Sequence, residues 1–419
     1  MNDILLPTRR ALVIGGLLSA AALSLSAERA AAQPSLNVTF GRALNTLSST
    51  DAVSADDRRT TGAAVEAEHT LAGKRLRLFY TLDAGDYTTP GDWRYYENIA
   101  GATWQLRPQQ SKGLAVFAGT DALWRTNGAS WAAADYRALG LFVNAEWKPS
   151  ETRTVRTGYR ADVRAFPDMP ELDQVEHEGF GSAVFNLQSR TTLVAELRVG
   201  AKRYDVLDST ALETASPAPV TPDGSGSAWS RGRGSRASGL VMSTPSHSPT
   251  GSVGGTAGQV TVLGRVAQSL TDRTGVTLQY SRRDSFGALP TAVVNTPALF
   301  FDDGVYDDPF ASDAGALRVS LKHLLRGGMT IDGMGVWVRK DYRGTAALDA
   351  EGYALATGDL RADRIWQAGA SWTMPAFRER TGPVGFDLFV DYLYTRHRSN
   401  DAFYNYSSHG FGIGVSMAY

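Results

Sequence analysis

Three arginines recur at every fourth position in one short stretch of the chain. Arg156, Arg160 and Arg164 fall among small or apolar residues that alternate with charged ones from Val155 to Val163. In an extended strand this spacing places all three guanidinium groups on one face. Unpaired arginines are almost never buried in an apolar core, so we expect this face to meet water or carboxylates. A cationic row beside confined water raises the local concentration of anions.

Other charged side chains occupy equivalent alternating positions elsewhere, and we expect them to line the same water-filled space. Basic residues outnumber acidic ones in the strands near the middle of the chain, which predicts a weak preference for anions. The alternative is that these charges only solvate a wall, as exposed ion pairs often do. The further predicted pore-lining residues are Arg75, Arg77, Arg198, Lys202, Arg318, Lys322, Glu66, Glu68, Asp387 and Asp391.

Two other groups of residues have the chemistry of a site. Asp302, Asp303, Asp307 and Asp308 bring four carboxylates into one predicted loop, and oxygen ligands at this density can hold Ca²⁺. Their spacing does not match an EF-hand, and a solvated acidic loop is the alternative. The chain has no cysteine, which excludes thiolate metal sites and disulfides. We expect no cofactor.

The second group with the chemistry of a site is a histidine near carboxylates. Of the six histidines, His397 is the best candidate, because we expect it near the outer rim beside Asp391 and Asp401. An Asp–His pair is part of the machinery of hydrolases. A histidine near carboxylates more often has a structural role, so a hydrolase is the weaker interpretation and we expect no catalytic residues.

Composition excludes some classes of protein. Lys plus Arg number 42 against 43 Asp plus Glu, for a net charge of -1, which argues against a nucleic-acid partner. The mean hydropathy is -0.22, and beyond the first thirty residues no apolar run approaches the roughly 18 residues of a membrane helix.

Residues 1–32 read as a signal peptide. Arg9-Arg10 supplies the charged region, Ala11 to Leu23 the apolar region, and Ala30 to Ala32 a small-residue cleavage site before Gln33. Thr8-Arg9-Arg10 also resembles the start of a twin-arginine signal, but that route carries folded cargo, so we favour ordinary secretion.

Period-two alternation returns along almost the whole remainder, residues 33–419. About sixteen short strands follow one another, and longer connections, such as 45–60, alternate with shorter ones, such as 73–74. The Ser-, Gly- and Pro-rich stretch 205–257 interrupts the pattern as a long loop. This rhythm predicts an all-β, up-and-down antiparallel barrel. Several aromatic residues near the predicted strand ends fit an interfacial girdle: Trp104, Trp124, Trp147, Trp372, Tyr392, Tyr394 and Tyr404.

The last strand carries a more specific pattern. Phe411, Ile413, Val415, Met417 and Tyr419 alternate with glycine, serine and alanine, and the sequence ends on the aromatic residue. This stretch looks like the closing strand of bacterial outer-membrane β-barrels, where it is the signal read by the barrel assembly machinery. The alternative is the final strand of a soluble sandwich.

The resemblance implies a transmembrane β-barrel in outer-membrane lipid with both termini in the periplasm. It also implies a porin-like channel for small hydrophilic solutes or ions. Porins of this general size usually fold one long loop into the pore as a constriction. Here the third outer connection, 125–134, is short, so we expect 205–257 or 287–312 to narrow the pore instead. The alternative function is a barrel that holds a protein partner, such as a surface lipoprotein or an electron-transfer cytochrome. Because the chain has no CxxCH motif, any haem would belong to that partner.

Overall fold

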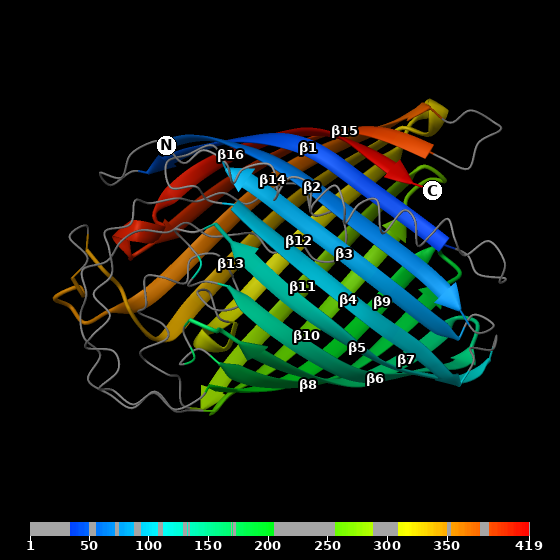
Figure 1. Ribbon diagram of the computed structural model, residues 1–419, viewed down its shortest axis with the longest axis horizontal. Coiled ribbons are helices and arrows are strands. Elements are labelled where there is room, and N and C mark those ends of the chain that lie inside the picture. The colour runs from blue at the N-terminus through cyan, green and yellow to red at the C-terminus, as the bar shows by residue number, and fades with distance from the viewer. Residues whose placement is uncertain are drawn as a thin grey trace, which may run out of the picture.

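The computed structural model contains one closed barrel of sixteen strands (Figure 1). It describes residues 34–49, 56–71, 75–87, 94–107, 112–128, 135–168, 173–204, 256–287, 309–349, 353–377 and 385–418, with the single residues 132 and 170. The strands are β1 (Pro34–Ser49), β2 (Asp56–Leu71), β3 (Leu76–Tyr87), β4 (Arg94–Arg107), β5 (Gly113–Asn127), β6 (Tyr136–Ser150), β7 (Arg153–Ala165), β8 (Gln174–Leu187), β9 (Thr191–Tyr204), β10 (Thr256–Ser269), β11 (Thr274–Gly287), β12 (Ser312–Leu324), β13 (Thr330–Ala346), β14 (Leu360–Phe377), β15 (Gly385–Ser399) and β16 (Tyr406–Ala418).

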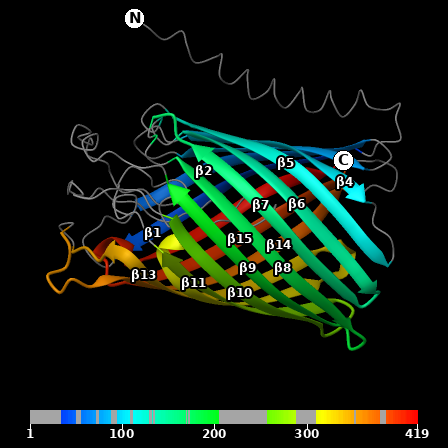
Figure 2. The same ribbon diagram turned by 90° about the horizontal axis from the view of Figure 1, so that it is seen from below.

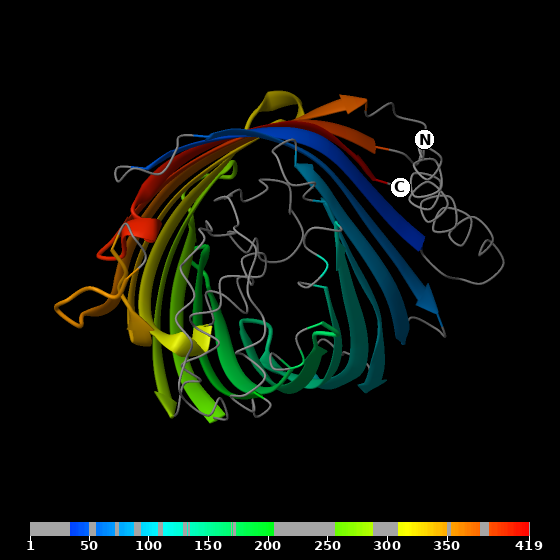
Figure 3. The ribbon, with the colours of Figure 1, turned by 60° about the vertical axis from the view of Figure 1, so that its left-hand side comes forward.

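Every strand pairs antiparallel with its neighbours in sequence, and β1 closes the ring against β16. Figures 2 and 3 show the strands running obliquely around the barrel wall, as closure of a sheet requires. The predicted all-β, up-and-down, sixteen-stranded fold is therefore confirmed. Within the described ranges, no helix is long and apolar enough to cross a membrane.

The register at the closing pair places the two ends of the barrel together. Asn37 pairs with Ala418 and Ser49 with Tyr406, so β1 begins where β16 ends. We call this end the turn rim and the opposite end the loop rim. The loop rim carries the longest connections, 205–255 and 288–311.

The expected alternation of connection lengths is only partly regular. The strands β1 and β2 continue through much of the predicted loop 45–60, so the connection between them is only 50–55. The connection 378–384 on the turn rim is longer than that. The sequence prediction missed these strand ends because they are polar and carry no apolar alternation to mark them.

Three short 3₁₀ helices accompany the strands: η5 (Pro309–Ala311), η6 (Arg326–Gly328) and η7 (Ala402–Tyr404). The helices η5 and η7 follow loop-rim connections, whereas η6 forms the turn between β12 and β13. Gly327 and Gly328 have φ of 77° and 79°, a conformation that glycine adopts without steric cost and that this tight turn requires.

One face of the barrel wall is covered with exposed apolar side chains. Leu139, Leu141 and Val143 alternate along β6 and are about half exposed, and Ile413 on β16 is 55% exposed. Comparable side chains recur on the neighbouring strands around the ring, including Val163, Leu197, Val262, Leu278, Val319, Trp366 and Leu388. Side chains on the convex surface of a barrel diverge, which leaves them open to the surroundings. A continuous apolar surface of this extent is stable against lipid and not against water.

Aromatic residues near the strand ends fall into two groups. Trp104, Trp124, Trp147 and Trp372 are exposed, as an interfacial girdle would be. Tyr404 does not fit that expectation, because it lies in η7 and is buried. Large aromatics also fill packed positions, and the sequence does not separate the two uses.

Candidate functional site: the inner surface of the barrel

The register of the strands shows which face of the barrel wall each predicted charged residue occupies. Arg160 on β7 pairs with Phe142 on β6, so both lie on the face opposite Leu141. The same reasoning places each predicted pore-lining residue that belongs to a strand on the inward face. Arg75 is the exception, because it lies in the turn just before β3. The inward residues of the predicted set are Glu66, Glu68, Arg77, Arg156, Arg160, Arg164, Arg198, Lys202, Arg318, Lys322, Asp387 and Asp391.

Arg160 is the centre of the tightest ion-pair cluster. Its Nη2 lies 2.6 Å from Asp121 Oδ2 on β5, and its Nε lies 2.6 Å from Asp162 Oδ2 two residues along β7. The guanidinium crosses β6 at Gly140, where an added Cβ would lie 2.3 Å from Arg160 Nη2. A side chain at position 140 would therefore block the bridge. The cluster ties three neighbouring strands together on the inner surface.

Two other inward arginines, Arg156 and Arg198, also meet carboxylates. Arg156 Nε lies 2.7 Å from Glu146 Oε2, and Arg198 lies 2.5 Å from Glu196 and 3.2 Å from Glu178. These pairs are partly exposed, so solvent screens each of them and each contributes little to stability. They fix the directions of the guanidinium groups. They also cancel much of the positive charge that the sequence pattern suggested.

The wall formed by β2 to β5 is acidic. Glu66 and Asp83 add carboxylates to Glu68, which pairs with Arg77 at 2.6 Å. Glu97 on β4 accepts a hydrogen bond from Tyr136 Oη at 3.2 Å and lies 3.5 Å from an arginine of β5. Among the described side chains of this inward face, carboxylates outnumber arginines, so this part of the wall carries a net negative charge.

The wall formed by β10 to β12 is basic. Arg265, Arg283, Arg318 and Lys322 all point inward from it. Lys322 is 3.9 Å from Asp332, and Arg318 contacts the sulfur of Met334 at 3.7 Å. Arg265 and Arg318 form no ion pair with a carboxylate in the part of the chain that the structure describes. The strand order places this wall across the ring from the acidic one.

Several cationic side chains stack on buried aromatic rings near the loop rim. The guanidinium of Arg125 lies 4.5 Å from the ring centre of Tyr95, and that of Arg164 lies 4.8 Å from Tyr136. The Lys202 ammonium lies 5.0 Å from the ring centre of Tyr204 and is only 2% exposed. Arg164 and Lys202 thus sit in packed positions at the rim, although both face inward as the sequence pattern predicts.

The end of the 288–311 connection is packed inside this rim. Phe310 is buried against the inward face of β9, where its ring lies over Gly200. The carbonyl of Pro309 accepts a hydrogen bond from Gln259 Nε2 at 2.9 Å. This segment belongs to one of the two predicted constriction loops, 287–312. The other, 205–257, lies almost entirely outside the described residues.

His397 is buried in a polar cluster at the same rim. Its Nε2 lies 3.0 Å from Asp363 Oδ2, and Asp363 in turn pairs with Arg361 at 2.5 Å. The carboxylate beside His397 is therefore neither of the two that the sequence indicated. Asp401 instead accepts the backbone N–H of Leu348.

Two further observations bear on hydrolase chemistry at His397. Asp391 lies six residues away along β15, about 20 Å in an extended strand. Among the described residues, no serine or threonine hydroxyl is hydrogen-bonded to the histidine, whose ring lies 5.9 Å from Tyr404 and 5.1 Å from Tyr406. The environment is that of a packed structural histidine.

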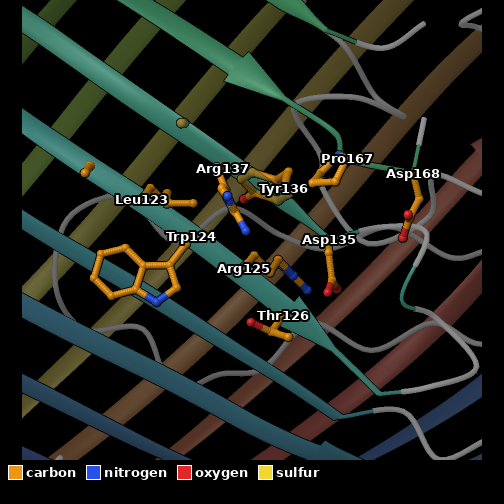
Figure 4. Close-up of a pocket in the computed structure, with 11 residues that line it drawn as sticks. Leu123, Trp124, Arg125, Thr126, Asp135, Tyr136, Arg137, Pro167 and Asp168 are labelled. Atoms are coloured by element: carbon orange, nitrogen blue, oxygen red, sulfur yellow. The ribbon is translucent and has the colours of Figure 1, made fainter. Parts of the chain in front are cut away.

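A recess opens at the loop rim between β5 and β6 (Figure 4). Asn127 lies beside it and donates two hydrogen bonds to Asp135 Oδ1, one from its backbone N–H at 2.6 Å and one from its side-chain amide at 3.0 Å. Its lining residues include Trp124, Arg125, Thr126, Asp135, Tyr136, Arg137, Pro167 and Asp168.

The predicted calcium ligands Asp302, Asp303, Asp307 and Asp308 lie outside the described residues. Within the described ranges, no group of three or more His, Asp or Glu side chains is arranged to hold a metal ion.

Sequence reasoning missed several members of the inner surface. Asp121 and Glu178, which bind the arginines, and Asp83 and Glu97 of the acidic wall were not singled out. Each is a carboxylate on the inward phase of a strand that also carries several apolar or small residues. That signal was available in the sequence, since a lone charge on the inward phase of a strand has to face water or a partner.

Some solved structures resemble this barrel at low sequence identity. No protein-family model matches the chain, and no curated protein matches it. Solved structures that it resembles include OpdO of Pseudomonas aeruginosa, at 11% identity and a TM-score of 0.45 over 93% of this chain and 97% of the other. OccAB1 of Acinetobacter baumannii matches at 10% identity and a TM-score of 0.47, over 91% and 96% of the two chains.

A loop-deletion mutant of OmpT, an outer membrane protein of Vibrio cholerae, matches at 10% identity and a TM-score of 0.39, over 93% and 100% of the two chains. At these values the likeness assigns no activity. The fold itself is established by the chain's own strand pairing.

Proposed function

We propose that this chain is an outer-membrane channel through which small hydrophilic solutes or ions diffuse, with a weak preference for anions. The observation that supports it is the pair of opposed walls: an acidic wall on β2 to β5 faces a basic wall on β10 to β12 inside a closed barrel with an apolar exterior. Opposed charges across a water-filled passage produce a transverse field that acts on permeating ions.

The weak anion preference follows from which charges are left without partners. Arg77 and Arg125 partly offset the acidic wall, whereas Arg265 and Arg318 of the basic wall have no carboxylate partner among the described residues. Arg156, Arg160 and Arg198 are paired with carboxylates, which limits the positive charge that remains. The preference should therefore be modest.

Orientation and assembly form part of the same proposal. The turn rim, where both ends of the barrel lie, would face the periplasm, and the loop rim would face outward. The outward side chains of β16, Phe411, Ile413 and Val415, would contact lipid after the assembly machinery has read the strand.

The deciding experiment is single-channel conductance of the purified protein in a planar lipid bilayer. Discrete conductance steps are expected, and a salt gradient should give a reversal potential displaced slightly toward the anion value. Absence of any conductance, even after removal of 205–255, would refute the channel and leave the partner-holding barrel in its place. An enzymatic role has no support in the surroundings of His397.

A further inference from the structure

A row of arginines crosses the outer surface of the barrel near the loop rim. Arg339 on β13 pairs in register with Arg364 on β14, and Arg364 pairs with Arg398 on β15. Arg282 on β11 stands at the same level, because it and Arg339 both pair with Gly315 of β12. All four side chains are exposed. We call these four residues the arginine row.

The row faces outward, away from the proposed channel. Arg364 lies two residues from Trp366, which is 57% exposed, and Arg282 lies two residues from Tyr280, which is 51% exposed. Side chains two residues apart in a strand share a face. Asp363, the neighbour of Arg364 in sequence, points the other way and is buried in the cluster around His397.

Like charges directly opposite each other on neighbouring strands are destabilising. The protein offsets part of this repulsion itself, since Arg282 pairs with Asp284 at 2.6 Å and Arg339 with Asp341 at 3.0 Å. Across β14 and β15 it does not. In the described ranges Arg364 and Arg398 have no acidic partner, nor has Arg396 on the same face of β15. The geometry therefore leaves an uncompensated positive patch on these two strands.

The depth of the patch indicates what would compensate it. One step closer to the middle of the wall, Tyr280, Leu317, Trp337 and Trp366 form the next outward row, and the Trp337 and Trp366 rings meet edge to face at 6.4 Å. Aromatic rows of this kind mark the boundary between acyl chains and headgroups. The arginines thus lie at the level of lipid headgroups.

We propose that Arg364 and Arg398, with Arg396 beside Trp366 in the row beneath them, bind the phosphate group of a membrane lipid in the leaflet at the loop rim. The planar guanidinium fork matches phosphate oxygens, and paired residues on neighbouring strands, about 5 Å apart at Cα, place two forks around one phosphate. A soluble anion would use the arginines but not the apolar row beneath them. An anionic head joined to an apolar tail uses both.

The test is native mass spectrometry of the full mature protein in detergent, titrated with lipid A carrying two phosphates. The same titration is repeated with lipid A from which both phosphates have been removed. We expect the phosphorylated form to bind and the dephosphorylated form to bind much more weakly. The double variant Arg364→Gln, Arg398→Gln should lose about ten- to thirtyfold in apparent affinity, since each interfacial cation contributes about 1 kcal/mol.

Arg203→Gln is the matched control. Arg203 is exposed on the same face near the same rim, but its register partners are Val175 and Thr256 and not arginines. The Arg203→Gln variant should bind lipid A with the same affinity as the unchanged protein. Arg364→Lys with Arg398→Lys, which keeps the charge, should retain part of the binding even if the glutamine variant folds poorly. Heat-modifiable gel migration reports folding for each variant.

Three results would overturn the proposal. One is equal binding of the two lipid A forms, which would assign the interaction to apolar contact alone. Another is unchanged affinity in a folded glutamine variant. The third is full occupancy by inorganic phosphate with no added affinity from the lipid, which would make the patch a site for free anions. None of these outcomes depends on whether the barrel conducts.

Discussion

Replacing Arg160 with glutamine tests whether the inner-surface cluster lies on an ion pathway. In the unchanged protein the guanidinium lies 2.6 Å from carboxylate oxygens of both Asp121 and Asp162. Without it, two carboxylates remain close to Gly140 with no cation between them. The local charge changes from one negative to two negative, and neighbouring water becomes more favourable for cations.

The size of the effect follows from Coulomb's law. For an ion passing about 5 Å from the lost charge in a water-like dielectric, the interaction is about 0.8 kcal/mol. Salt at about 0.1 M has a screening length of about 10 Å and reduces this to about 0.5 kcal/mol. The free energy of a cation near the cluster falls by this amount and that of an anion rises by it. Each local ion concentration therefore changes about twofold. The ratio of anion to cation permeability should fall about fivefold.

The assay is the reversal potential of single channels under a salt gradient at low and high ionic strength. Arg160→Gln should move it toward the cation value, and Asp162→Asn should move it toward the anion value, since Arg160 keeps Asp121 as its partner. The double variant is neutral relative to the unchanged protein and should return close to the original potential. All shifts should shrink at high salt.

This design separates the electrostatic argument from structural damage. A distorted barrel would alter conductance in both single variants without opposite signs and without recovery in the double variant. If Arg160→Gln conducts normally with an unchanged reversal potential at low salt, the cluster does not face the permeation pathway. The assignment of the inner surface would then be wrong.

Three further predictions concern the wall, the loop and the N-terminus. Leu141→Arg should destabilise the barrel by about 2–4 kcal/mol in a membrane-refolding titration, because it places a charge in mid-bilayer lipid, whereas Phe142→Gln on the inward face should cost less; equal costs would contradict the register. Deletion of most of 205–255 should leave heat-modifiable gel migration intact, since loop length has a small energetic cost, and should change conductance if the loop narrows the pore. Intact-mass measurement should show cleavage after Ala32, and a mature protein that retains Met1 would refute it.

The fold was predictable because the alternation repeats on nearly every strand. Leu139, Leu141 and Val143 are outward in the structure as their spacing requires, and the inward phase of β7 carries all three arginines. Because side chains alternate with a period of two residues, assigning one residue to a face assigns every other residue of that strand. Strand ends such as those of β1 and β2 were less predictable, since polar residues beyond the membrane keep the backbone pairing without any hydrophobic signal.

The charged network was only partly predictable because its partners are distant in sequence. Arg160 and Asp121 are 39 residues apart and meet across β6 only because that strand carries Gly140 at the crossing. The same limit applied to His397, whose carboxylate neighbour Asp363 comes from β14 and not from the nearby residues of β15. Lone charges were visible in the sequence, but their pairing required the register of adjacent strands.

Register also changes which cations would determine ion preference. The run Arg156, Arg160 and Arg164 is the most conspicuous charge pattern in the sequence, yet two of these arginines are held by carboxylates and the third stacks on Tyr136. An arginine with its charge matched locally contributes a short-range dipole, whose field falls off faster than that of an unmatched charge. Arg265 and Arg318, which look unremarkable in sequence, have no such match in the described part of the chain. The positive side of the long-range field inside the barrel therefore originates mainly from β10 and β12, opposite the acidic wall. The arginine run of β7 acts chiefly through the local contacts that hold its own strand to β5 and β6.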